Sequence, residues 1–201
     1  MATASNRTGV HSFEDFCWIV EDGQKADLID GTIYMASPDS TDADELFGWL
    51  RSLLLLYVNQ MKLGRVFGSR VAFRLDELNG PEPDIAFLRN GRKSQIQRGF
   101  VLGPPDLAIE IVSPDSIERD YERKRIQYEA AGVRECWIID DFEQKVTVLR
   151  LDGKGKYRDI RPRKGRFHSL VISGFWLDAS WLWQRPLPDL LEVLRLIRGP
   201  A

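Results

Sequence analysis

The stretch at residues 106–112 constrains this chain more than any other part of the sequence. It reads Asp-Leu-Ala-Ile-Glu-Ile-Val and follows two consecutive prolines. Neighbouring side chains of a strand point to opposite faces, and after Asp106 both faces are apolar except at Glu110. Such a strand is typical of the centre of a sheet that is covered on both sides. We therefore predict a covered sheet with one acid, Glu110, inside it.

Hydrophobic periodicity and turn residues predict the other elements. Asp30-Gly31 between two apolar stretches indicates a hairpin, and leucines at helical spacing indicate a long helix. The mixed order of helices and strands favours an α/β (α+β) fold, in which helices pack on one sheet. The basic stretch between 88 and 106 is predicted to be an exposed loop. The predicted helices are 13–21, 41–63, 117–131 and 188–197, and the predicted strands lie within 26–35, 66–75, 84–88, 106–112, 134–139, 145–151 and 156–160.

Length and charge limit the class of protein. A chain of 201 residues with 43% hydrophobic and 29% charged residues is typical of one globular domain. We place this domain at 12–201, after a flexible leader at 1–11. The 28 basic and 30 acidic residues give a net charge of −2, without the basic excess of a protein that coats DNA nonspecifically. A local basic groove beside an acidic site is still compatible with this charge.

The sequence also predicts a cytoplasmic protein without a membrane segment. The longest apolar run, residues 53–58, is far shorter than the about 20 residues that span a bilayer. The first residues lack the apolar core of a signal peptide. Two isolated cysteines, Cys17 and Cys136, provide neither a zinc-site spacing nor a disulfide framework. A reducing compartment fits this cysteine usage best.

Glu110 and Asp84 are candidate metal ligands. A carboxylate in an apolar strand is costly unless a metal, a lysine or an arginine compensates its charge. Asp84 follows Pro83 at the start of the preceding strand, and oxygen ligands from two nearby strands are what Mg²⁺ prefers. The alternative for Glu110 is a buried structural ion pair or a strand face open to water. The alternative for Asp84 is an ordinary turn residue after proline.

Lys124 is the third candidate. In the predicted helix 117–131 it shares a stripe with Tyr121, Tyr128 and Ala131, at spacings of three and four residues. These neighbours are typical of a side that faces the core, so in this interpretation Lys124 points toward the sheet. The alternative is a surface lysine whose stem packs against the tyrosines.

Together these residues suggest phosphodiester hydrolysis. A metal on Asp84 and Glu110 would polarise a phosphoryl oxygen and lower the pKa of a bound water. Lys124 would orient that water or stabilise the charge that develops on phosphorus. Tyr128 would hold Lys124 or touch a phosphate. Two arginines near the helix start are candidates for binding the nucleic-acid backbone, namely Arg119 and Arg123.

On these residues the sequence resembles the PD-(D/E)XK nuclease superfamily. Within it, the chain is similar to a large family of small restriction-endonuclease-like proteins that was first catalogued as a domain of unknown function. The resemblance implies a mixed central sheet flanked by helices, DNA as substrate, and a Mg²⁺ site (Mn²⁺ able to replace it) with Asp84 and Glu110 as ligands. It also implies that Asp27 completes the site. The matching segments are 27–31, 83–85, 105–114 and 120–140.

Two positions depart from the superfamily pattern. The superfamily lysine usually follows the glutamate by two residues, where this chain has Val112. The family that the chain resembles supplies its lysine from the next helix, which matches Lys124. Relatives often begin the long helix with a histidine, whereas Ala43 or Asp44 occupies that region here.

Two other functions stay open at this point. A nuclease-like fold without catalysis, acting as a nucleic-acid-binding or regulatory module, agrees with the near-neutral charge and with Val112. A glycosidase-like carboxylate pair would leave Lys124 unexplained, although the chain has six tryptophans for a sugar cleft. We expect Trp176, Trp181 and Trp183 to pack in a core or a dimer interface instead. A homodimer is compatible with these functions, because many nucleases act on two strands, but no residue pattern requires one.

Overall fold

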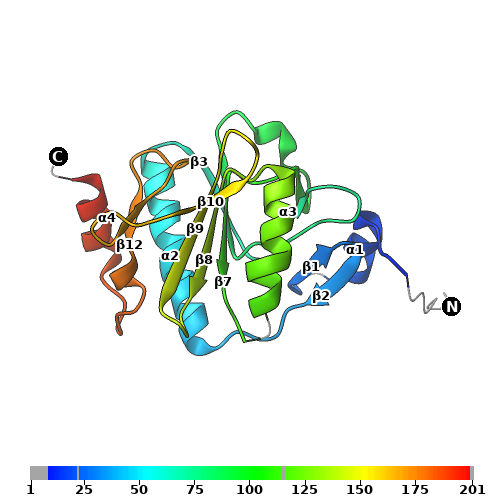
Figure 1. Cartoon of the computed structure of the whole chain (residues 1–201), viewed down its shortest axis with the longest axis horizontal. Coiled ribbons are helices and arrows are strands. Elements are labelled where there is room, and N and C mark those ends of the chain that lie inside the picture. Colours follow the sequence, from blue (N-terminus) through cyan, green and yellow to red (C-terminus); the bar gives the residue numbers. More distant parts are fainter. Residues whose placement is uncertain (1–8, 22, 115, 200–201) are drawn as a thin grey trace.

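The computed structural model describes residues 9–21, 23–114 and 116–199, so most of the predicted leader lies outside the described residues. A six-stranded sheet in the order β10-β9-β8-β7-β5-β3 forms its centre (Figure 1). β7 and β8 are parallel and the other neighbours are antiparallel, so the sheet is mixed. Its strands are β3 (Gly64–Gly68), β5 (Ile85–Arg89), β7 (Leu107–Ile111), β8 (Glu135–Asp140), β9 (Lys145–Leu151) and β10 (Tyr157–Ile160).

Helices cover both faces of the sheet, as predicted (Figure 1). α2 (Thr41–Gln60), slightly shorter than predicted, and α4 (Leu190–Arg198) lie on one face, where they share a core cluster with Leu107. The helix at 117–131 lies on the other face, in a cluster that includes Val112. β7 is buried on both sides because its alternate side chains meet different helices.

The helix at 117–131 contains a wider turn in its first half. Residues 117–118 are α-helical, Arg119–Arg123 form a π-helical segment, and α3 (Lys124–Ala131) continues as an α-helix. Short π-helical turns of this kind are frequent at functional sites. Gly132 ends the helix with a φ of 81°, which glycine adopts without steric cost.

A smaller layer lies beside the main sheet, next to this helix (Figure 1). β1 (Ala26–Ile29) and β2 (Thr32–Met35) form the predicted hairpin. α1 (Phe13–Ile19) starts at Ser12, whose side chain forms a capping box with Asp15. The hairpin places Asp27 of β1 against the helix that carries Lys124.

Two predictions for the middle of the chain were wrong. The single strand predicted at 66–75 is two strands, β3 and β4 (Ala72–Arg74), because the chain turns at Arg70 (φ 74°) and leaves the main sheet. β4 pairs in parallel with β6 (Phe100–Leu102), which lies where an exposed loop was predicted. Val101 of β6 is buried, since this small pair packs on the main sheet.

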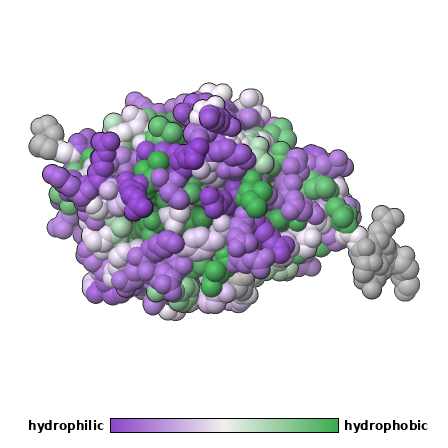
Figure 2. Space-filling model, viewed as in Figure 1, coloured by the Kyte–Doolittle hydropathy of each residue, from purple (hydrophilic) through white to green (hydrophobic). Residues whose placement is uncertain are grey.

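The C-terminal part packs around α2. Trp176 and Trp181, whose rings lie 5.1 Å apart, pack against the core on that face. The face seen in Figure 2 is mostly hydrophilic, with hydrophobic residues in separate areas. Within the described part of the chain, none of the helices combines the length and apolarity that a bilayer crossing needs. The remaining short elements are η1 (Lys93–Gln95), β11 (Arg166–His168), β12 (Trp176–Asp178) and η3 (Ala179–Trp181).

Candidate active site

The pairing of β5 with β7 brings Asp84 and Glu110 together. The antiparallel register pairs Ile85 with Ile109, so Asp84, which directly precedes β5, faces Glu110. Ile85 and Ile109 both belong to the core cluster on the α2 side. Because side chains alternate along a strand, the two acids point to the opposite face, which the helix at 117–131 covers.

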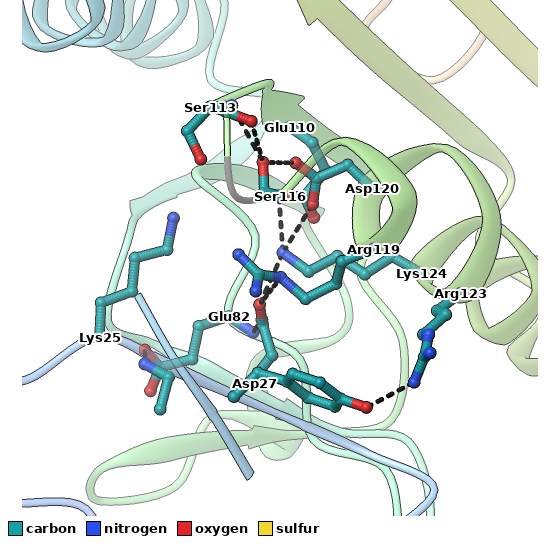
Figure 3. A network of polar contacts seen from close by, with 12 residues as sticks. Lys25, Asp27, Glu82, Glu110, Ser113, Ser116, Arg119, Asp120, Arg123 and Lys124 are labelled. Carbon is teal, nitrogen blue, oxygen red and sulfur yellow. Dashed lines mark hydrogen bonds and ion pairs between the residues drawn. The ribbon is translucent and has the colours of Figure 1, made fainter. Parts of the chain in front are cut away.

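Lys124 points into the protein from the start of α3 and is surrounded by acids (Figure 3). Its side chain is 2% exposed, and its Nζ lies 2.9 Å from Glu110 Oε2, 3.0 Å from Asp27 Oδ2 and 3.4 Å from Asp120 Oδ1. This orientation agrees with the stripe in the sequence. Burial lowers the pKa of Lys124, but these three acids and Asp84 together outweigh burial and raise that pKa well above its ordinary value. The amine therefore stays protonated.

Glu110 is held from two sides. Lys124 donates a hydrogen bond to Oε2, and the hydroxyl of Tyr128 donates one to Oε1 at 2.6 Å. Tyr128 therefore supports Glu110, whereas the sequence analysis suggested a contact with Lys124 or with a phosphate. Burial raises the pKa of Glu110 to about 8, although Lys124 acts in the opposite direction. Lys124 therefore compensates only part of the cost of burying the negative charge of Glu110.

Asp84 is fixed by the sheet and paired with a lysine that the sequence analysis did not single out. The backbone N–H of Ile111 donates to Asp84 Oδ2 at 2.7 Å. The other oxygen, Oδ1, forms an ion pair with Lys25. Lys25 directly precedes β1, and no periodic pattern in the sequence separates it from a surface lysine. Only the packing of the hairpin against the sheet brings it to Asp84.

Asp27 and one of the two candidate arginines, Arg119, complete the surroundings of Lys124. Asp27 reaches the site, as the resemblance implied, through Lys124 and through Arg119, whose Nε lies 3.4 Å from Asp27 Oδ2. The side chain of Arg119 is 12% exposed, and its Nε makes no hydrogen bond within the described residues. Arg123 lies outside the pocket, is exposed, and donates a hydrogen bond to the hydroxyl of Tyr34. The two arginines that the sequence analysis treated alike therefore occupy different places.

Asp120 is a further acid of the site, to which the sequence analysis assigned no role. It is 3% exposed, and its Oδ2 accepts a hydrogen bond from Ser116 (Figure 3). Its Oδ1 makes no hydrogen bond among the described residues, although Lys124 Nζ forms an ion pair with it at 3.4 Å. Burial raises the pKa of Asp120, although Lys124 acts in the opposite direction. Its place four residues before Lys124 was the signal that could have found it, because residues at this spacing share a helix face.

The side chains of the site open into one narrow polar pocket of about 30 Å³. Among the described residues that line this pocket, four carry a carboxylate and three carry a cation. Asp27 adds a fifth carboxylate beside Lys124. The pocket therefore contains more carboxyl groups than cationic groups. The acids of the lining are Asp39, Asp84, Glu110 and Asp120, and its cations are Lys25, Arg119 and Lys124.

The acids are not preassembled as a metal cage. Within the described residues, no group of three or more His, Cys, Asp and Glu side chains is arranged to hold a metal ion. Hard oxygen donors are present at Asp84 and Glu110, but each of these acids faces an ammonium group. Val112, at the usual superfamily position of the lysine, is 2% exposed and belongs to an apolar cluster with Tyr128. The lysine beside Glu110 is thus supplied by the helix.

Comparison with known proteins covers most of the chain. A family model, Uma2, described as "Putative restriction endonuclease", matches residues 10–180, which include every pocket residue named above. The chain belongs to the Uma2 family. This Uma2 domain is similar in fold to a crystal structure described as "a putative nuclease belonging to DUF820" from Anabaena variabilis ATCC 29413. The TM-score is 0.71 at 20% sequence identity, over 86% of this chain and 97% of the other. No curated protein matches the sequence.

Proposed function

We propose that this Uma2 domain hydrolyses phosphodiester bonds of DNA, with Mg²⁺ as the cofactor and Mn²⁺ as a substitute. One observation carries the proposal. Neighbouring strands place Asp84 opposite Glu110, and the ammonium group of Lys124 lies 2.9 Å from Glu110. Two acids and a lysine at one point suit metal-assisted hydrolysis. The family description points to an endonuclease, and from it we infer DNA as the substrate.

The donor set fits a hard divalent cation. Mg²⁺ prefers carboxylate oxygens and keeps several of its waters, and Asp84 and Glu110 would be its protein ligands. The surplus of acids in the pocket supports an additional cation, and so does the buried Oδ1 of Asp120, whose contact with Lys124 is a 3.4 Å ion pair without a hydrogen bond. When bound, the ion supplies Lewis-acid activation of the phosphate and lowers the pKa of a bound water.

The residues of the chain prepare this reaction. Lys124 holds Glu110 and Asp27 in place and neutralises part of their charge. Arg119 lines the pocket, and its guanidinium group suits a phosphate oxygen. A water oxygen bonds to phosphorus and loses its proton to solvent, while the bond to the leaving oxygen breaks and that oxygen takes up a proton. The products are one phosphomonoester end and one hydroxyl end.

A second candidate is a nucleic-acid-binding or regulatory module without catalysis. The observation that favours it is that both oxygens of Asp84 and of Glu110 already have protein partners. If Lys25 and Lys124 lock the pocket permanently, metal does not enter, and nucleic acid binds only to surface residues such as Arg123. The glycosidase alternative has less support, because the described lining of the pocket contains no tryptophan.

Metal binding and DNA cleavage separate the two candidates. Mn²⁺ binding is measured by electron paramagnetic resonance, and cleavage of supercoiled plasmid is followed with Mg²⁺, Mn²⁺ or EDTA. A nuclease binds Mn²⁺ and cuts only with metal, and Glu110→Gln loses both properties. The matched control is Glu143→Gln, which changes an exposed glutamate and keeps both. Wild-type protein that binds no Mn²⁺ and leaves the plasmid intact overturns the nuclease in favour of the module.

A further inference from the structure

The two lysines of the pocket are held in different ways. Lys124 forms ion pairs with three carboxylates, those of Glu110, Asp27 and Asp120, and its side chain is 2% exposed. Lys25 pairs with a single carboxylate, Asp84, within the part of the chain that the structure describes, and 21% of its side chain is exposed. Figure 3 shows Lys25 apart from the acids that enclose Lys124. Lys25 is therefore the ammonium group that a ligand in the pocket can reach.

The hairpin fixes the backbone of Lys25 but leaves its side chain free to change partner. The backbone N–H of Ala36 donates to the carbonyl of Lys25 at 3.0 Å, across the open end of the hairpin. The flexible four-carbon stem of the lysine extends from there to Asp84. Asp84 is fixed, because its Oδ2 accepts the backbone N–H of Ile111 at 2.7 Å. Its Oδ1 is the oxygen left for the pocket, and Lys25 occupies it.

We propose that Lys25 contacts the phosphate that is cut, and that it competes with the metal for Asp84 Oδ1. This inference rests on the function proposed above. If Asp84 Oδ1 were to hold a metal ion, Lys25 would face a like charge, and the two would repel each other strongly in a partly buried pocket. Lys25 would then leave Asp84, and a phosphate oxygen of the substrate would be the new anion within its reach.

Lys124 is poorly suited to this contact. Moving its ammonium group toward a substrate would leave Glu110, Asp27 and Asp120 buried without their shared cation, which is strongly unfavourable. Lys124 is thus a positioning residue that holds Glu110. From the sequence, Lys124 was expected to orient the attacking water or to stabilise the charge on phosphorus. In this proposal Lys124 positions Glu110, and Lys25 contacts the phosphate.

The variant Lys25→Met tests both parts of the proposal. Mn²⁺ is expected to bind about tenfold more tightly, since the competing charge is gone. Plasmid cleavage at saturating Mn²⁺ is expected to fall about a hundredfold, because the phosphate loses its ammonium partner. The matched control is Lys156→Met, which removes a lysine from an ion pair with Glu129 (2.7 Å) outside the pocket. It is expected to keep the wild-type affinity and rate.

The outcomes are distinct. Unchanged or weaker Mn²⁺ binding by folded Lys25→Met overturns the competition for Asp84, and unchanged cleavage overturns the phosphate contact. If circular dichroism shows that this variant is unfolded, Lys25→Arg decides, since it keeps the charge and is expected to retain most of the cleavage. Cleavage by Lys25→Arg that is a hundredfold below wild type overturns the contact.

Failure of the proposed function has a different signature. Wild-type protein then binds no Mn²⁺ and cuts no plasmid, and the inference falls together with the function. If wild-type protein binds and cuts while Lys25→Met behaves like Lys156→Met, the nuclease stands and only the inference about Lys25 falls.

Discussion

Two buried glutamates on neighbouring parallel strands, Glu110 of β7 and Glu135 of β8, have opposite surroundings. They are 1% and 0% exposed, so they are equally removed from water. Glu110 points to the pocket, whereas Glu135 points to the other face together with Trp137. Glu135 accepts hydrogen bonds from the Trp137 indole at 2.7 Å, from the Leu170 backbone N–H at 2.5 Å and from Arg150 at 3.2 Å.

The difference between the two sites lies in the other charges and not in burial. Burial raises the pKa of both glutamates, to about 8 for Glu110. Glu135 has three donors to itself, so its surroundings are complete. Glu110 shares Lys124 with Asp27 and Asp120, so positive charge is in short supply. A buried acid indicates only that its charge needs compensation, whereas several acids around one lysine indicate a place for a cation.

Neutralising each glutamate gives the largest expected contrast. Glu110→Gln is expected to reduce metal-dependent cleavage about a thousandfold, because a neutral amide neither binds Mg²⁺ well nor aligns with Lys124. Glu135→Gln is expected to cut at the wild-type rate per folded molecule, because Glu135 lies on the other face of the sheet. Single-turnover cleavage, scaled by the folded fraction from circular dichroism, measures both. If both variants lost cleavage equally, the difference that we draw between Glu110 and Glu135 would be wrong.

Removing the cationic residue beside each glutamate gives a smaller expected contrast, which is measured as the free energy of unfolding. Lys124→Met leaves three buried acids without their partner and is expected to lower the metal-free free energy of unfolding by about 3 kcal/mol. Arg150→Met is expected to cost about 1 kcal/mol, because Glu135 keeps two other donors and the Arg150 side chain is already 23% exposed. Urea unfolding in EDTA compares them. If Arg150→Met lowered the free energy of unfolding more than Lys124→Met, positive charge would be scarcer around Glu135 than around Glu110, contrary to our conclusion.

Local patterns were enough to predict the central strand of the sheet and the inward direction of Lys124. The alternation in 106–112 predicted a covered strand with Glu110 inside, and β7 is buried on both sides in this way. The stripe on the helix predicted the inward direction of Lys124. Both features are encoded within a few residues, because a strand or a helix face repeats at a fixed short period.

The residues that the sequence analysis missed depend on contacts between distant segments. Lys25 and Asp84 are 59 residues apart and meet only because the hairpin packs beside β5. Glu135 was passed over because an acid at the first position of a strand is ordinary in a sequence, and its three donors come from separate places. The pairing of β4 with β6 is likewise non-local, and strands of three residues carry too short a pattern to predict.

The smallest expected effect is the change in thermal stability when Mg²⁺ is added, and it also separates Glu110 from Glu135. At a few times its Kd, Mg²⁺ is expected to stabilise the wild-type protein by about 1 kcal/mol, which corresponds to a rise in Tm of roughly 2–4 °C for a domain of this size. Glu135→Gln should show the same rise from its own metal-free Tm, since its pocket is intact, and EDTA should reverse it.

Glu110→Gln should show no rise, because it lacks one of the two proposed ligands. If Mg²⁺ stabilises Glu110→Gln as much as the wild type, the ion binds elsewhere. The surplus of acids around Glu110 would then not be what sets it apart from Glu135.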